Sequence, residues 1–238
     1  MVGLISAVFE EGKEVSKHLK ERSVVGGKQI FKGKIHDRDI AYVVSGIGKT
    51  NAAHATTILS EKFLPDVIVL FGVGGAYPSA GLRVGDIAIA EKEVYGDEGV
   101  FTGEGFRGAD LIGIPFLKKG SKKYFNEFPL DKKLAKKAVK SLKLVTGFKT
   151  GTFVTVSTVT GTEKRARELQ KRFEAICENM EGAAVAHIST MYGIPMLEIR
   201  GISNIVECRN KGKWDLKIAA DNCQRVVMEV IKTLQATR

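Results

Sequence analysis

The sequence has few cysteines, and those it has form no recognisable pattern. Cys177, Cys208 and Cys223 include no CxxC pair, and their odd number leaves at least one without a disulfide partner. Neither a disulfide framework nor a zinc site is therefore indicated. We expect three buried thiols and no metal site.

A long apolar run is also missing. No stretch reaches the roughly 18 residues that a membrane span needs. The N-terminus begins directly with the strand-like segment VGLISAVF, and not with a charged segment, a long apolar stretch and a cleavage site. We expect a cytoplasmic protein that has no membrane partner.

Acidic residues are outnumbered, because 27 Asp and Glu stand against 37 Lys and Arg, for a formal net charge of +10. Such a surplus is typical of a nucleic-acid surface, a site for an anionic small substrate, or a Lys-rich exterior. The lysines are scattered among helix-forming residues, and no RNP, helix-turn-helix or finger motif is present. We expect no nucleic-acid partner. The alternative, a basic RNA-binding module, predicts strongly salt-dependent association with RNA.

Strand-length apolar runs alternate with segments of helical periodicity, which predicts one three-layer α/β domain spanning residues 1–238. Strands are expected near 2–8, 29–34, 39–45, 67–73, 86–90, 153–157 and 196–202, with a short one before Glu178. Helices are expected near 10–21, 49–63, 163–173, 181–192 and 216–235. Residues 95–129 break this rhythm and form a candidate substrate loop or inter-subunit arm.

Two glycine-rich segments superficially resemble nucleotide-binding loops. Residues 45–52, SGIGKTNA, fail as a phosphate loop because Val43 stands where its first glycine would be, and Asn51 replaces the third glycine of a dinucleotide fingerprint. We expect a tight strand-to-helix turn there, with ligand contact as the alternative. Residues 71–78, FGVGGAYP, end a buried strand, and Gly74 and Gly75 would let a ligand approach the backbone; a turn without a ligand is the alternative.

Four motifs, in this order and at these separations, resemble the purine nucleoside phosphorylase and nucleosidase superfamily, in its methylthioadenosine nucleosidase-like branch. They are SGIGKTNAA, GVGGAYPSAGLRVGDIAIAEKEVYGD, NMEGAAVAH and RGISN. Within that branch the sequence looks most like the futalosine hydrolases, which release hypoxanthine from futalosine in menaquinone biosynthesis. The resemblance implies a three-layer α/β/α fold with a central mixed sheet, a purine nucleoside substrate, no cofactor, and a homodimer or larger homo-oligomer.

Other activities fit the same resemblance. They are a methylthioadenosine/S-adenosylhomocysteine or aminodeoxyfutalosine nucleosidase, a purine nucleoside phosphorylase, and a catalytically silent nucleoside-binding protein. The phosphorylase branch typically presents an arginine just ahead of its glycine loop, where this chain has the apolar residues 69–71. Water is therefore the expected nucleophile.

The glutamate of NMEGAAVAH is the first candidate catalytic residue. The resemblance implies that Glu181 accepts hydrogen bonds from the ribose 2′- and 3′-hydroxyls while Met180 packs against the sugar and base. A carboxylate offers two acceptor oxygens to a vicinal diol, and its charge stabilises the cation that develops on the sugar during cleavage. The alternative is an acid that merely favours a helix N-terminus. Arg200 is expected to support this acidic site, and His187 to be a core residue.

A second glutamate is needed to orient the attacking water. The resemblance places it in the turn after the first strand, where Glu11 fits the spacing best and Glu10 and Glu14 are alternatives. An acidic first turn of a helix would explain the same residues without any catalytic role.

The purine is expected to meet Asn204 and the segment around Val159. Adenine nucleosidases carry an aspartic acid at the position of Asn204, whereas an amide donates to a 6-oxo group and accepts from a protonated N7. This departure favours hypoxanthine, and a strand-end residue that bonds locally is the alternative. For the 5′ aryl carboxylate of futalosine, composition alone suggests Tyr95, Phe101, Phe106 and Arg107, and a subunit interface is an equally good explanation for them.

Overall fold

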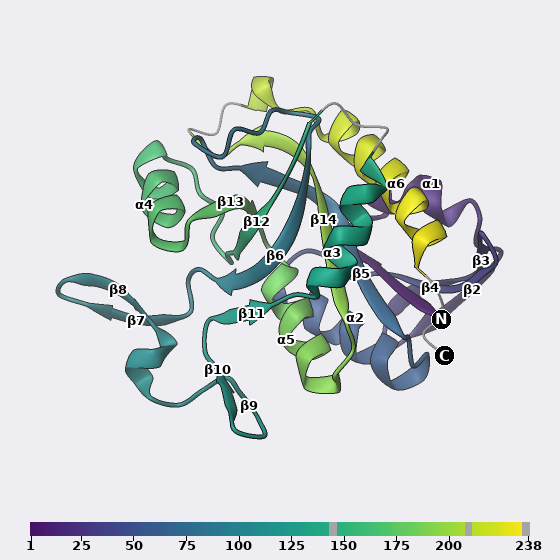
Figure 1. Ribbon diagram of the computed structural model, residues 1–238, viewed down its shortest axis with the longest axis horizontal. Coiled ribbons are helices and arrows are strands. Elements are labelled where there is room, and N and C mark those ends of the chain that lie inside the picture. The colour runs from purple at the N-terminus through teal and green to yellow at the C-terminus, as the bar shows by residue number, and fades with distance from the viewer. Residues whose placement is uncertain (143–146, 208–210, 235–238) are drawn as a thin grey trace.

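The computed structural model describes residues 1–142, 147–207 and 211–234. Its helices pack on both faces of a central mixed sheet, as Figure 1 shows. The predicted three-layer α/β/α fold is confirmed. Cys177 and Cys223 are buried free thiols as expected, and Cys208 lies outside the described residues.

Ten strands form the central sheet in the order β11-β6-β12-β13-β5-β1-β4-β3-β2, and β14 pairs with both β5 and β6. Their bounds are β1 Val2–Ser6, β2 Glu21–Val25, β3 Lys28–Ile35, β4 Arg38–Val44, β5 Val67–Ala76, β6 Ile87–Tyr95, β11 Glu127–Pro129, β12 Phe148–Thr155, β13 Ala175–Asn179 and β14 Met196–Ile205. The pairings β5-β14-β6-β12-β13-β5 form a closed circuit, which brings the ends of distant strands together.

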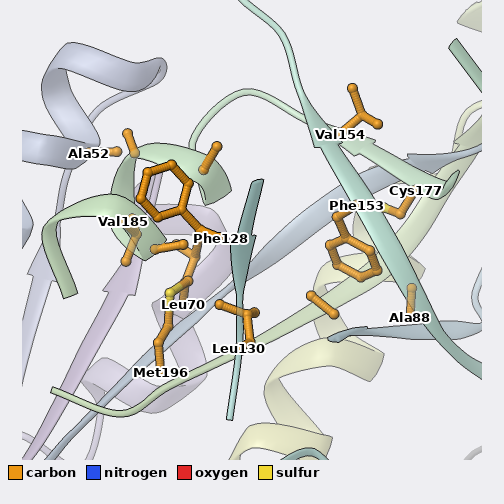
Figure 2. Packing of buried hydrophobic residues seen from close by; sticks show 14 of the residues in the cluster. Ala52, Leu70, Ala88, Phe128, Leu130, Phe153, Val154, Cys177, Val185 and Met196 are labelled. Carbon is orange, nitrogen blue, oxygen red and sulfur yellow. The ribbon is translucent and has the colours of Figure 1, made fainter. Parts of the chain in front are cut away.

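Two layers of helices cover the sheet. Their bounds are η1 Phe9–Gly12, α1 Lys13–Ser16, α2 Lys49–Lys62, η2 Ala109–Ile112, α3 Lys132–Lys140, α4 Glu163–Phe173, α5 Gly182–Tyr192, η4 Lys211–Lys213 and α6 Leu216–Thr233. Helices α2, α4 and α5 contribute to one apolar core, part of which is drawn in Figure 2, and α1, α3 and α6 contribute to the other. Central strands such as β5 are buried on both faces, which explains their nearly continuous apolar sequence.

The predicted helix at 10–21 is wrong in its length. The chain forms the short turn η1 and the single turn α1, and then enters the edge strand β2, which the sequence did not predict. The sequence of β2 is ERSVV, and the strand lies at an exposed edge of the sheet, so no apolar alternation marks it as a strand.

The segment 95–129 is more regular than expected. It contains the hairpin β7 Gly99–Thr102 with β8 Gly105–Gly108, the hairpin β9 Leu117–Lys119 with β10 Lys122–Tyr124, and the edge strand β11. Both hairpins lie at the periphery of the molecule in Figure 1, and β9 contacts α5, where Lys119 donates to the carbonyl of Thr190 at 2.8 Å. The helix α3 follows and was also not predicted, because its five lysines in nine residues obscure its apolar face.

The expected loop at 71–78 is mostly strand, since β5 continues to Ala76. The turn at 45–52 is as predicted: β4 ends at Val44, and α2 begins at Lys49. This turn and the ends of β1, β5, β13 and β14 surround one cavity.

Candidate active site

A cavity of about 390 Å³ lies where these strand ends meet. Its walls come from the turn after β1, the end of β5, the β13–α5 junction, β14 and the start of α6. The residues that the sequence analysis assigned to the ribose, the attacking water and the purine line it, namely Glu11, Gly74, Gly75, Val159, Met180, Glu181 and Asn204.

The carboxylate of Glu11 is buried at one end of the cavity and held by three backbone amides. Its Oε2 accepts from the amides of Ala7 at 2.9 Å and Val8 at 3.1 Å, and its Oε1 accepts from Val73 at 2.8 Å. Gly72 lets the carboxylate approach the backbone of β5, because a Cβ on Gly72 would meet Oε1 at 2.5 Å. The short turn η1 therefore fixes Glu11 in one place.

Glu10 and Glu14, the alternatives to Glu11, are both exposed, and Glu14 pairs with Lys17 at 2.7 Å. Neither lines the cavity that holds Glu181. The geometry therefore favours Glu11 over its two neighbours.

Burial raises the pKa of Glu11 above the ordinary glutamate value, and the nearby charge of Glu181 raises it further. The Arg200 guanidinium and the amides of Val73 and Val8 lower this pKa but do not reverse the shift. A carboxylate with a raised pKa is a stronger base, which suits a group that must accept a proton from water.

Glu181 immediately precedes α5 and is almost fully buried. Its Oε1 accepts from the backbone amide of Gly48 at 3.0 Å, and its Oε2 accepts from Nη2 of Arg200 at 3.3 Å. Because each carboxylate oxygen has two lone pairs, both oxygens retain a position for a further donor such as a ribose hydroxyl.

Arg200 is the cation among the described residues that line the cavity, and its side chain is 1% exposed. Besides Glu181, its guanidinium donates to Oε1 of Glu198 at 2.9 Å and to the carbonyl of Val73 at 3.1 Å. The surrounding carboxylates raise its pKa despite burial, so it stays charged. Arg200 therefore offsets negative charge that would otherwise be buried without a partner.

Asn204 lies near the end of β14, and its side chain bonds locally. Its Oδ1 accepts from the hydroxyl of Ser203 at 2.8 Å, and its Nδ2 donates to the carbonyl of Ile205 at 3.1 Å. One N–H and one lone pair remain, so the amide retains a donor and an acceptor for a ligand.

The structure adds a residue that the sequence analysis missed. Glu178 on β13 accepts from the amide of Thr160 at 2.9 Å and from its hydroxyl at 2.6 Å, and Tyr77 donates to Glu178 at 3.0 Å. Glu178 therefore fixes the segment that carries Val159 into the cavity. The acid at the end of an otherwise apolar strand, AICEN, was the available sequence signal.

Packing alone is enough to require glycine at positions 74 and 75. A Cβ on Gly74 would meet Sγ of Cys177 at 2.6 Å, and a Cβ on Gly75 would meet Val206 at 2.7 Å. Both residues still line the cavity through their backbones.

The four residues suggested for the 5′ end of the substrate do not line this cavity. Tyr95 is buried against Phe116 and Phe128, and Phe101 is 83% exposed. Phe106 borders a neighbouring hollow with Val159, and Arg107 borders another hollow further away. His187 packs against Phe128 with ring centroids 4.6 Å apart but is only half-buried, so the expected core position is met in part.

The described parts of the chain show neither a metal site nor a membrane-spanning helix. No cluster of three or more His, Cys, Asp or Glu side chains there is arranged to hold a metal ion. No helix within the same ranges combines the length and apolarity needed to cross a membrane.

Known proteins are similar to this chain in sequence and fold. The phosphorylase superfamily profile matches residues 1–236. A futalosine hydrolase of Thermus thermophilus is 35% identical over 190 residues, which cover 80% of each chain. A 5′-methylthioadenosine/S-adenosylhomocysteine nucleosidase of Geobacillus sp. is 28% identical over 242 residues, which cover 98% of this chain and 99% of that one.

Among solved structures, a 5′-methylthioadenosine/S-adenosylhomocysteine nucleosidase from Neisseria meningitidis superimposes with a TM-score of 0.84 at 24% identity. The match covers 98% of this chain and 99% of the other, so the two share their whole fold. Together with the family match over almost the entire sequence, these likenesses show that the chain belongs to the phosphorylase superfamily, in its nucleosidase branch.

Proposed function

We propose that this protein hydrolyses the N-ribosidic bond of futalosine and releases hypoxanthine, without a cofactor. The observation that carries the proposal is the placement of Glu11 and Glu181, with Arg200 beside them, in one cavity whose other wall holds the amide of Asn204. The likeness to a futalosine hydrolase at 35% identity supports the choice of substrate.

The two glutamates divide the chemistry at the ribose. Glu181 accepts hydrogen bonds from the 2′- and 3′-hydroxyls and stabilises the positive charge that develops on the sugar as the bond to the purine breaks. Glu11 accepts a proton from a water molecule as the water oxygen bonds to the anomeric carbon, and the purine leaves with the electron pair of the N-ribosidic bond and takes up a proton from solvent. The raised pKa of Glu11 favours this proton transfer.

Hydrolysis is favoured over phosphorolysis by the charges in the cavity. Arg200 is the only cationic residue among the described residues that line the cavity. Its guanidinium already bonds to Glu181, Glu198 and the carbonyl of Val73. A phosphate dianion would therefore lie beside buried carboxylates without a cation of its own. Water carries no charge and meets no such penalty.

Asn204 favours a 6-oxopurine as the leaving group. Its free N–H is available to O6 of hypoxanthine, and its remaining lone pair is available to a protonated N7. An aspartate at this place would accept from a 6-amino group but would repel a 6-oxo group.

The second candidate is a methylthioadenosine/S-adenosylhomocysteine nucleosidase. It is favoured by the likeness of 28% over 98% of this chain. A rotated Asn204 amide would present its oxygen to the 6-amino group of adenine. The ribose chemistry is the same for both candidates, so only the base and the 5′ substituent distinguish them.

The test is purine release in phosphate-free buffer from futalosine, aminodeoxyfutalosine, methylthioadenosine and inosine in parallel. Hypoxanthine from futalosine alone is the expected result. Adenine from the amino substrates would replace the first candidate with the second, and a strict requirement for added phosphate would contradict hydrolysis.

We also propose that the chain works as a homodimer or larger homo-oligomer. The exposed apolar side chains of Phe101, Ile112 and Ile114 on the segment between β6 and β11 form the candidate contact. Sedimentation analysis of the protein and of Ile114→Lys tests this, and an unchanged monomer in both would contradict it.

A further inference from the structure

Two carboxyl groups outside the cavity converge beneath the first residue of α5. Glu93 on β6 and Glu198 on β14 are both completely buried. A Cβ on Gly182 would lie 2.0 Å from Oε1 of Glu93 and 2.5 Å from Oε2 of Glu198, so both oxygens approach the same point. Only a glycine leaves room for them there.

One carboxylate oxygen of this pair, Oε2 of Glu198, lacks a hydrogen-bond donor among the described residues. Oε1 of Glu93 accepts from Asn179 at 2.6 Å, and Oε2 accepts from Thr155 at 2.7 Å. Oε1 of Glu198 accepts from Arg200, while Oε2 of Glu198 has no donor among the described residues. A hydroxyl proton on Glu93 would supply the donor that Oε2 of Glu198 lacks.

We propose that Glu93 and Glu198 share one proton and act together as positioning residues for Glu181. Burial raises the pKa of Glu93, and the neighbouring Glu198 charge raises it further. Burial also raises the pKa of Glu198, and Arg200 and a hydrogen bond from Glu93 oppose this effect. Because the Arg200 guanidinium bonds to Glu198, the negative charge is assigned to Glu198 and the proton to Glu93.

Glu93 binds two side chains, Asn179 and Thr155, that accept hydrogen bonds from the backbone at and after Glu181. Asn179, held by Glu93, accepts from the amides of Glu181 at 2.9 Å and Gly182 at 2.7 Å. Thr155, also held by Glu93, accepts from the amide of Ala183 at 2.7 Å. These three amides belong to the unpaired start of α5, which needs such acceptors.

Glu198 affects the side chain of Glu181 through the guanidinium that both carboxylates bind. Glu198 and Glu181 bind the same guanidinium, that of Arg200. If Glu198 were neutral, Arg200 would be drawn toward Glu181 and would weaken its attraction for a cationic sugar. The expected effect on catalysis depends on the proposed function, whereas the inference of a shared proton is independent of it.

The pair also sets a pH limit. The charged or titratable groups around it are Arg200, Glu181, Cys177 and Tyr95, and burial raises the pKa of both Cys177 and Tyr95, so these two stay neutral. Loss of the shared proton at alkaline pH would place two repelling charges beneath Gly182 and displace the start of α5. Activity should then fall on the alkaline side.

Infrared spectroscopy tests the proton directly, without any substrate. The wild-type protein should show the carbonyl band of a neutral carboxylic acid at neutral pH. Glu198→Gln should remove this band although Glu93 is still present, because the amide introduced by the substitution donates to Glu93, which then ionises. Glu11→Gln and the matched control Glu91→Gln, at an exposed residue of the same strand as Glu93, should keep it.

Kinetics test the positioning role. Glu198→Gln should lower kcat/KM by about tenfold or more and abolish the alkaline fall, whereas Glu91→Gln should leave both unchanged. Absence of the neutral-acid band from the wild type, or its survival in Glu198→Gln, would overturn the proposal. Absence of the band from the wild-type spectrum contradicts the shared proton even if the variant does not fold. A correct band without any nucleoside hydrolysis would instead contradict the proposed function.

Discussion

Arg200 donates to Oε2 of Glu181 across 3.3 Å, and the two side chains are 1% and 5% exposed. Arg200 also serves Glu198 and lies close enough to Glu11 to lower the pKa of that carboxyl. One guanidinium therefore stabilises carboxylates that come from three separate parts of the chain.

Replacing Arg200 by Gln should destabilise the protein strongly. The change leaves buried carboxylates without their cation, and breaking a buried ion pair in this way costs about 3–5 kcal/mol. The free energy of unfolding in urea measures the loss. Arg167→Gln removes an exposed pair with Glu163 and should change stability little. Equal stabilities of the two variants would contradict the role assigned to Arg200.

Glu11→Gln should abolish most of the activity while preserving binding. The amide keeps the size of the side chain but does not accept a proton from water, so kcat should fall about 10²–10⁴-fold with little change in KM. Steady-state release of purine measures both constants. Glu10→Gln, at the exposed neighbour, is the control and should behave as the wild type. If Glu10→Gln is inactive and Glu11→Gln is active, Glu10 orients the water and our assignment to Glu11 is wrong.

Activity should fall on the acid side at a pH above that of an ordinary glutamate. The pKa of Glu11 is raised, chiefly by burial, so its carboxylate is lost as the pH falls through that raised value and not near the usual value of about 4.3. A profile of kcat/KM against pH locates the limb. The residual activity of Glu11→Gln should lack it, and a limb shared by both proteins would point to another group.

Asn204→Asp should shift the preference among purines. A carboxylate accepts from a 6-amino group and is repelled by a 6-oxo group, so the ratio of hypoxanthine to adenine release should fall by about tenfold or more. Paired assays with futalosine and aminodeoxyfutalosine give this ratio. An unchanged ratio would show that the local bonds of Asn204 to Ser203 and Ile205 are its whole role.

Gly72→Ala should reduce activity by moving Glu11. The new Cβ would lie 2.5 Å from Oε1 of Glu11, so the carboxylate has to leave its amide donors. We expect a loss of about 1–3 kcal/mol in stability and a lower kcat. Gly103→Ala, where a Cβ meets nothing within 4 Å, is the matched control. Normal kcat in Gly72→Ala would mean that Glu11 tolerates displacement.

The sequence by itself determined the layered fold and most of its elements, because apolar periodicity is a local property that strands such as β5 and helices such as α4 display directly. It also identified the motif residues Glu11, Glu181 and Asn204, all of which line one cavity. Local periodicity failed at β2, where no residue is buried, and at α3, where five lysines surround a small buried face.

Only the tertiary structure decided which groups meet. The resemblance preferred Glu11 but left Glu10 and Glu14 open, and only the structure shows that Glu11 is buried while the other two are exposed. The pair Glu93 and Glu198 comes from strands that are far apart in the sequence and meet only because β6 and β14 lie together in the sheet. Burial and long-range contact set the pKa values and bonds of these groups, so their chemistry follows from the fold and not from the motifs.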